Sequence, residues 1–291
     1  MLKKLYGISI LLLVSIASGA QSDVNVIRIN SSYTSFPDTG RNKGHTYKTV
    51  LYDATRHYMD SSVLIITPKK LEARKKLDMI FWFHGWGNNI DSAVVRYDLT
   101  KQFVASKVNA VLVLAETAKD APDSYGGKLE QKSVFNSLLH DVLYKLKTEN
   151  MISKRCKKGN IILAGHSGAY RVMAYILQNG NVPVKEVILF DALYAETDKF
   201  ISWIQTDLNN RFINVYTNNG GTYDESKEMI KQLFKLKIRA DTVEEKDLTP
   251  EVLQREKIVF IHSLHEHNDI IRDPDNFQFF IENTSWLKGR R

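Results

Sequence analysis

Cysteine is nearly absent from this sequence of 291 residues, in which Cys156 is the single one. One cysteine cannot form an internal disulfide, which excludes the small disulfide-rich scaffolds of secreted proteins. No histidine or carboxylate motif adjoins Cys156, so we assign it no chemistry. The sequence also lacks repeats, low-complexity tracts and linkers rich in proline, glycine and serine. These absences favour a single domain covering residues 21–291.

Long apolar runs are missing beyond the N-terminus. Lys3 and Lys4 precede the apolar stretch 8–14, and the small residues 18–20 follow it. This order is typical of a secretory signal peptide of residues 1–20, with cleavage after Ala20. An uncleaved membrane anchor is the alternative, but the stretch is shorter than the roughly 20 apolar residues that a membrane span needs. We therefore expect an exported bacterial protein, periplasmic or extracellular, with no stable membrane insertion after cleavage.

The distribution of charge does not indicate a nucleic-acid-binding site. The formal net charge is +7, and removal of Lys3 and Lys4 with the signal peptide leaves +5. Basic residues are scattered except at 154–158, where a solvated turn between two elements explains them. No nucleic-acid-binding motif accompanies this cluster, so we expect no nucleic-acid partner.

What the sequence does contain is a series of short apolar runs. Two early segments, 24–29 and 62–68, are rich in β-branched residues and predict strands. Further strands are predicted at 79–83, 110–114, 161–164, 187–190, 212–216 and 258–261. Strands that are apolar on both faces belong in a sheet covered on both sides, which is a mostly parallel sheet.

Helical spacing fills the intervals between these runs. One stripe consists of Phe135, Leu138, Leu139, Val142 and Leu146; a second consists of Ala169, Val172, Met173, Ile176 and Leu177; a third consists of Met229, Ile230, Leu233 and Phe234. Alternation of strand and helix predicts an α/β fold with helices on both faces of the sheet. Only about twenty residues separate the runs at 187–190 and 212–216, which leaves room for one crossover helix and no large lid.

The segment 161–170 contains the predicted nucleophile motif. A buried strand runs into Gly165-His166-Ser167-Gly168-Ala169, and an amphipathic helix follows at once. Small residues on either side of a serine permit a very tight turn, which holds the serine in a strained conformation with its hydroxyl above the sheet edge. The helix N-terminus aims backbone N–H groups at the same point. We predict that Ser167 is a nucleophile.

In this arrangement the chain resembles the α/β-hydrolase superfamily, over roughly residues 60–275. Three stretches, Ala121–Lys128, Gly165–Arg171 and Phe190–Tyr194, are similar to those of exported bacterial serine hydrolases and esterases. The sequence Phe83-His84-Gly85-Trp86-Gly87 stands where that superfamily carries a His-Gly loop. By this resemblance, the backbone amides of Trp86 and Gly168 form an oxyanion hole. We expect His84 to brace the loop, and Gly85, Asp123 and His166 to contact the substrate. In the 121–128 stretch either Asp123 or Lys128 reaches the substrate, or the stretch is only a polar turn.

The predicted base follows the last strand. The chain order Ser, Asp or Glu, His of these enzymes places the base in the loop after 258–261. His262 is still part of the strand and is expected to be structural. We favour His267, which opens a turn into the terminal helices, and keep His265 as the alternative.

The acid that orients this base has two candidates. Asp191 directly follows the run 187–190, so it must lie at the carboxyl edge of the sheet, where open α/β sheets place their sites. Asp224 follows the next strand but lies eight residues beyond Tyr216. We favour Asp191, and expect Asp224 to cap a helix.

The predicted reaction is hydrolysis of a carboxylic ester by a Ser-Asp-His triad, on a small-molecule or polymer-linked acyl substrate. It requires no cofactor, and the spacing of His262, His265 and His267 does not match a zinc site, so we expect no metal. A peptidase or an acyltransferase would use the same residues. A non-catalytic cell-envelope binding protein on a hydrolase scaffold is the alternative from another class.

Overall fold

The computed structural model describes residues 23–73 and 75–290. The predicted signal peptide of residues 1–20 lies outside the described residues. Within them, no helix is long and apolar enough to cross a membrane.

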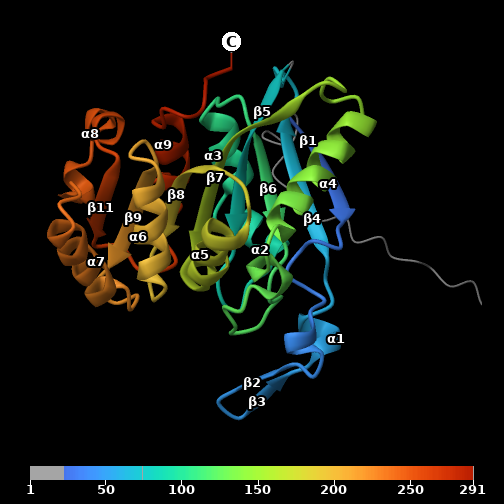
Figure 1. Cartoon of the computed structure of the whole chain (residues 1–291), viewed down its shortest axis with the longest axis horizontal. Helices are drawn as coiled ribbons and strands as arrows, with labels where there is room; N and C mark the ends of the chain where they lie inside the picture. Colours follow the sequence, from blue (N-terminus) through green and yellow to red (C-terminus); the bar gives the residue numbers. More distant parts are fainter. Residues whose placement is uncertain (1–22, 74, 291) are drawn as a thin grey trace, which may run out of the picture.

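A sheet of nine strands forms the centre of the molecule (Figure 1). Its order is β1-β4-β6-β5-β7-β8-β9-β11-β10. The strands are β1 (Val24–Asn30), β4 (Ser62–Pro68), β5 (Lys76–Phe83), β6 (Val111–Ala115), β7 (Lys157–His166), β8 (Val184–Phe190), β9 (Arg211–Thr217), β10 (Asp241–Glu244) and β11 (Ile258–Ser263). β4 pairs antiparallel with β1 and with β6, and every other pair is parallel. The predicted mostly parallel sheet is confirmed.

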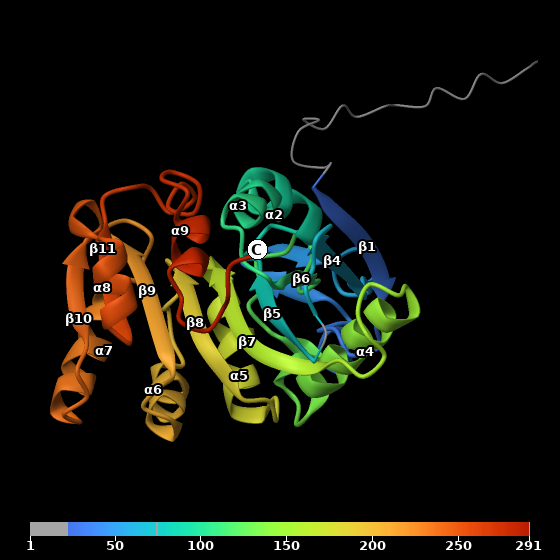
Figure 2. The ribbon, with the colours of Figure 1, turned by 90° about the horizontal axis from the view of Figure 1, so that it is seen from above.

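Helices cover both faces of this sheet (Figure 2). One face packs against α4 (Val134–Thr148), α5 (Tyr170–Asn179), α6 (Thr197–Thr206) and α7 (Tyr223–Lys235); the other packs against α2 (Ile90–Arg96), α3 (Leu99–Ala105), α8 (Pro250–Arg255) and α9 (Asn276–Glu282). The interval between β8 and β9 contains α6, as its length predicted.

Alternation along each strand builds two hydrophobic cores. In β5, Met79, Phe81 and Phe83 pack in the core beneath α4–α7, whereas Ile80 and Trp82 pack in the core beneath the other helices. All five side chains are buried. Burial on both faces explains why the strand sequences are apolar without a polar alternation.

Phe234 and β10 differ from the sequence prediction. Phe234, predicted to belong to the buried stripe of α7, is 82% exposed, because Ser226, Met229 and Leu233 form the face that packs on the sheet. The edge strand β10 was not predicted, since its sequence Asp-Thr-Val-Glu is polar at alternate positions and lacks an apolar run.

A small arm, which we define as residues 39–53, projects beyond the end of the sheet where the parallel strands finish (Figure 1). It contains the 3₁₀ turn η2 (Thr39–Arg41) and the hairpin of β2 (His45–Tyr47) and β3 (Val50–Tyr52), and the short helix α1 (Ala54–His57) follows it. A two-stranded hairpin has little stability of its own. The arm therefore depends on its contacts with the body of the molecule.

Cys156, directly before β7, is buried, with an exposed fraction of 1%. Burial raises the pKa of its thiol. No disulfide partner exists in the sequence, so it remains a buried free thiol.

Candidate active site

Ser167 occupies the bend between β7 and α5. β7 ends at His166, the 3₁₀ turn η4 covers Ser167–Ala169, and α5 begins at Tyr170. Ser167 has a φ of 55°, in the left-handed region that non-glycine residues rarely adopt. A Cβ built on Gly165 would lie 2.5 Å from the Met173 sulfur and 2.7 Å from the Ala169 Cβ, so this position accepts only glycine. The sequence therefore produces the tight, strained turn that it predicted.

The His-Gly loop after β5 lies directly against this bend. A Cβ built on Gly85 would lie 2.5 Å from the Ser167 Cβ, and one built on Gly168 would lie 2.4 Å from Cδ1 of Trp86. The Trp86 ring thus covers Gly168, and its Nε1 donates to the Ser124 hydroxyl at 2.7 Å. The two backbone segments that carry the Trp86 and Gly168 amides are therefore neighbours.

The main-chain amide of Trp86 has no hydrogen-bond acceptor within residues 23–73 and 75–290. Gly87, which follows it, has a φ of 60° and donates its N–H to the Ala121 carbonyl at 3.0 Å. Such an amide is available for an anionic ligand.

His84 braces this loop. Its Nδ1 lies 2.8 Å from the Gly85 carbonyl oxygen and its Nε2 lies 2.5 Å from Oε1 of Glu116, at the end of β6. Both partners accept, so the two bonds together need a proton on each ring nitrogen. Burial lowers the pKa of His84, but the charge and hydrogen bond of Glu116 outweigh it and the net shift is upward.

Asp191 lies directly after β8 and is fully buried. Its φ is 46°, a second left-handed residue at the same edge of the sheet. Its carboxylate accepts from the Thr217 amide at 3.2 Å, from the Thr217 hydroxyl at 2.7 Å and from the Thr222 hydroxyl. Burial raises the pKa of Asp191, but hydrogen bonds from His267, Thr222 and Thr217 outweigh it and lower the pKa below its usual value. Asp191 is therefore held as a carboxylate.

His267 donates Nδ1–H to this carboxylate. The distance from its Nδ1 to Oδ2 of Asp191 is 2.7 Å, and its side chain is 24% exposed. With Nδ1 held by Asp191, Nε2 is the nitrogen left for proton transfer. The structure thus brings together the acid and the base that the sequence favoured, from loops after β8 and β11.

His166 holds the main chain of His267. Its Nε2 donates to the His267 carbonyl oxygen at 2.8 Å, and its Nδ1 lies 3.1 Å from the Tyr97 hydroxyl. Burial lowers the pKa of His166 to about 3, so the ring is neutral. We expected His166 to contact the substrate; both of its ring nitrogens instead bind groups of the protein.

The alternative acid and base lie elsewhere. Asp224 is exposed in the first turn of α7, where an acidic side chain favours a helix N-terminus. His265 is 39% exposed, and its Nε2 lies 3.8 Å from Oε2 of Glu245. His262 lies between Glu244 and Asn218, at 2.8 and 2.9 Å, in the structural position expected for it.

Asp123 and Lys128 are both bound to the protein itself. Asp123 accepts from Arg41 Nε at 2.5 Å and from Arg41 Nη2 at 3.1 Å, and its side chain is 6% exposed. Lys128 donates to the Ser32 carbonyl at 2.6 Å. The 121–128 stretch therefore anchors the N-terminal segment. These contacts join residues far apart in the sequence, so the sequence alone does not indicate them.

Sequence reasoning missed Thr217, Thr222 and Tyr194. The Tyr194 phenol donates to the Gly220 carbonyl; burial and the Asp191 charge raise its pKa to about 12, while a hydrogen bond with the Ser167 hydroxyl opposes that rise. Thr217 is the last residue of β9 and lies at the same edge as Asp191, so inspection of the predicted strand ends could have identified it.

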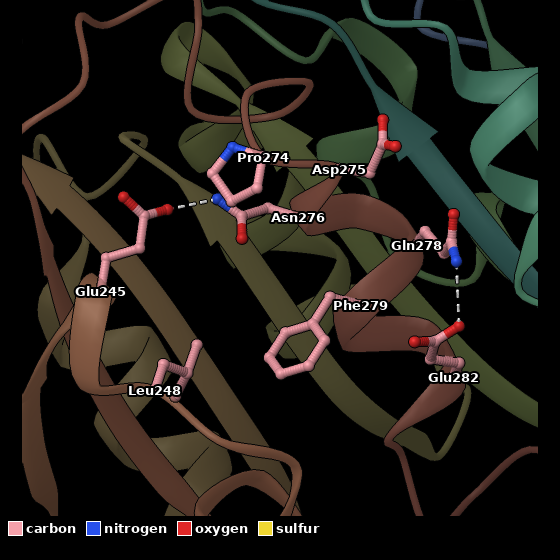
Figure 3. A pocket seen from close by; sticks show the side chains of 8 residues that line it. All are labelled: Glu245, Leu248, Pro274, Asp275, Asn276, Gln278, Phe279 and Glu282. Carbon is pink, nitrogen blue, oxygen red and sulfur yellow. Dashed lines mark hydrogen bonds between the residues drawn. The ribbon is translucent and has the colours of Figure 1, made fainter.

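A hollow of about 370 Å³ lies between the 3₁₀ turn η5 (Glu245–Asp247) and α9 (Figure 3). There the Asn276 amide donates to Oε1 of Glu245 at 2.5 Å, and Ser263 donates to Oε2 at 2.5 Å. Glu245 thus joins both ends of the loop that carries His267.

Among the residues described, no group of three or more histidine, cysteine, aspartate or glutamate side chains is arranged to hold a metal.

Solved structures with similar folds were found over nearly the whole chain. FphF, a fluorophosphonate-binding serine hydrolase of Staphylococcus aureus, has a TM-score of 0.52 at 11% identity, over 88% of this chain and 99% of that one. FrmB, an S-formylglutathione hydrolase of the same organism, has a TM-score of 0.55 at 11% identity, over 90% of this chain and 99% of that one. A bacterial heroin esterase has a TM-score of 0.52 at 13% identity, over 94% and 87%. No protein-family model and no curated protein matches the sequence.

Proposed function

We propose that this chain, which has the α/β-hydrolase fold, is a serine hydrolase that cleaves carboxylic esters with Ser167, His267 and Asp191. The observation that carries the proposal is the 2.7 Å bond from His267 Nδ1 to a buried, ionised Asp191, at the sheet edge where Ser167 has a strained backbone. An aspartate in this position fixes the tautomer of the histidine and stabilises its protonated form.

The reaction follows in two steps. Ser167 Oγ attacks the ester carbonyl carbon while His267 Nε2 takes the hydroxyl proton, and the amides of Trp86 and Gly168 donate to the oxyanion. The intermediate then expels the alcohol, which takes the proton from His267, and leaves an acyl group on Ser167. Water attacks the acyl group with His267 again as the base, and release of the acid restores the serine.

Ester hydrolysis, rather than another acyl transfer, is proposed because it needs nothing beyond these groups. Two of the similar structures, FphF and the heroin esterase, are named as a serine hydrolase and an esterase. We also propose that the protein is exported.

The test is labelling of the purified protein with a fluorophosphonate probe, read by intact mass. The wild type is expected to gain one probe mass, and Ser167→Ala none. Turnover of 4-nitrophenyl acetate is expected to fall roughly 10⁶-fold in Ser167→Ala. A folded wild type that neither labels nor hydrolyses any member of a 4-nitrophenyl ester and aminoacyl-nitroanilide panel would refute the proposal, and turnover of the anilides alone would make it a peptidase.

A further inference from the structure

Two aromatic rings lead outward from the bend at Ser167. The Trp86 ring covers Gly168, the residue after Ser167. The ring of Tyr47, on the arm, meets Trp86 edge to face with 5.2 Å between centroids. Lys48 Nζ lies 5.5 Å from the centroid of Tyr47. We call Trp86, Tyr47 and Lys48 the outer row.

Contacts at its base hold the arm against the body of the molecule. Arg41 forms its two-point ion pair with Asp123, and its guanidinium carbon lies 4.6 Å from the Tyr125 ring centroid. The Tyr125 hydroxyl donates to Asp38 at 2.8 Å. The base of the arm is therefore bound to the same 121–128 stretch whose Ser124 accepts from the Trp86 indole, so the outer row is one connected unit.

The side of the hairpin that carries Tyr47 is apolar and partly open. Tyr47 pairs with Val50 across the two strands, so both side chains point to the same face. Val50 is 53% exposed and Trp86 is 45% exposed. Large side chains left open beside a nucleophile supply flat apolar contact area for a ligand.

The tip of the arm is positively charged. Within residues 39–53 the only carboxylate is Asp53, which accepts from the Arg56 amide at the start of α1. Arg41 is paired with Asp123, whereas Lys43 and Lys48 are exposed and form no ion pair within the described part of the chain. Lys48 lies at the turn of the hairpin with a φ of 53°, and its ammonium lies over the Tyr47 ring.

We infer that the outer row binds the remote part of the substrate, and that this part is a flat apolar group ending in an anion, such as a carboxylate. The inference rests on the proposed esterase function and adds a substrate class to it. With the carbonyl at Ser167, one side of the ester lies along Trp86 and Tyr47, and its terminal anion pairs with the Lys48 ammonium. The mechanism itself does not involve Lys48.

The test compares the kcat/KM values of matched esters. One pair varies the acyl group: the 4-nitrophenyl esters of biphenyl-4-carboxylic acid and of its 4′-carboxy derivative. The other pair varies the alcohol: biphenyl-4-yl acetate and its 4′-carboxy derivative. We expect the wild type to prefer the charged member of at least one pair by about five-fold, the scale of one exposed ion pair.

Lys48→Ala is expected to abolish this preference and Lys48→Glu to reverse it. Tyr47→Ala should lower kcat/KM about five-fold for both members of that pair, through loss of ring contact. 4-Nitrophenyl acetate carries no terminal anion, so its turnover is measured in all three variants to normalise the comparison. Lys101→Glu, an exposed position on α3 that matches the change in net charge, is the control and should keep the wild-type preference.

Raising the ionic strength should weaken the preference of the wild type, because exposed ion pairs are screened by salt. If 4-nitrophenyl acetate is hydrolysed but neither charged ester is preferred, or if Lys48→Glu behaves like Lys101→Glu, the inference is overturned and the esterase proposal stands. If the wild type fails to label and to hydrolyse the acetate, the esterase proposal itself has failed.

Discussion

At the scale of single residues, Ser167 and Asp191 share an uncommon backbone. Both have a positive φ, at 55° and 46°, and both directly follow a buried parallel strand. Each such conformation costs of the order of 1–2 kcal/mol for a residue with a side chain. The neighbouring contacts offset this cost, since the Asp191 carboxylate accepts hydrogen bonds from Thr217, Thr222 and His267.

Asp191→Asn is expected to lower kcat by roughly 10⁴-fold, because an asparagine amide lets His267 take the wrong tautomer. The matched control is Asp224→Asn, which should retain nearly full activity because Asp224 is exposed on α7. Steady-state kinetics with 4-nitrophenyl acetate measures both variants. Loss of activity in Asp224→Asn alone would assign the acid to Asp224.

His166 predicts a pH dependence of stability. The pKa of its buried ring is lowered from 6.5 to about 3, so between these values the unfolded chain binds a proton that the native ring does not. By linkage, the stability that His166 contributes is complete above pH 6.5 and falls as the pH drops toward 3. The difference in unfolding free energy between the wild type and His166→Gln should therefore shrink from pH 7 to pH 4 in urea titrations. A difference independent of pH would contradict the neutral state of this ring.

The position of Asp191 at the sheet edge was predictable from sequence because the residue directly follows its strand. The choice between His265 and His267 was not, since both lie in the irregular loop after β11. That loop takes its shape from long-range contacts such as the bond from His166 to the His267 carbonyl. Thr222 was out of reach for the same reason: its hydroxyl meets a carboxylate 31 residues earlier in the chain.

At the scale of elements, the apolar runs predicted the buried strands because burial on both faces leaves a plain signal. β10 and the hairpin of the arm escaped prediction. β2 and β3 have three residues each and are partly exposed, so neither period nor composition marks them. Their positions depend on side-chain contacts with residues 86 and 123–125.

The loop between β9 and α7 packs tightly over Asp191. A Cβ built on Gly220 would lie 1.6 Å from Oδ2 of Asp191 and 2.7 Å from the Thr217 hydroxyl. Gly220→Ala should therefore displace the loop and lower both the melting temperature and kcat, by at least about tenfold for kcat. Gly289→Ala, where an added Cβ meets nothing within 4 Å, serves as the control and should resemble the wild type in calorimetry and kinetics.

The His-Gly loop depends on Glu116. Glu116 raises the pKa of His84 above 6.5, so the stability from this pair is fully present below pH 6.5 and is lost as the pH rises through the higher native value. Glu116→Gln should consequently destabilise the protein more at pH 6 than at pH 9, as measured by urea unfolding. An equal or larger loss at pH 9 would show that His84 is not protonated in the native state.

At the scale of the whole molecule, one sheet of nine strands gathers the site from segments far apart in the chain. Parallel strands end at one edge, so Ser167, Asp191 and the loop that carries His267 all follow strands that end there, although 100 residues separate the first from the last. The order of chain segments thus predicted the neighbourhood of the site. It could not predict the position of the arm, which precedes the parallel strands in the chain and lies at the same edge of the sheet.

Export is a prediction at this scale. Expression of the full chain in a bacterial host should yield a mature protein that begins at Gln21, recovered from the periplasm or the medium. Intact mass and N-terminal sequencing check this result. A chain that keeps Lys3 and Lys4 and stays in the cytoplasm or with the membrane fraction would contradict it.

The single thiol gives the molecule a built-in reporter. Cys156 is buried where α4 covers the start of β7, and the sequence offers no second cysteine to confuse a measurement. With an exposed fraction of 1%, Cys156 should react with a thiol reagent more slowly than an exposed thiol, and faster when this side of the core opens. The same sample then supports two independent measurements. Modification of Cys156 reports on the core, and labelling with the fluorophosphonate probe tests the proposed nucleophile Ser167.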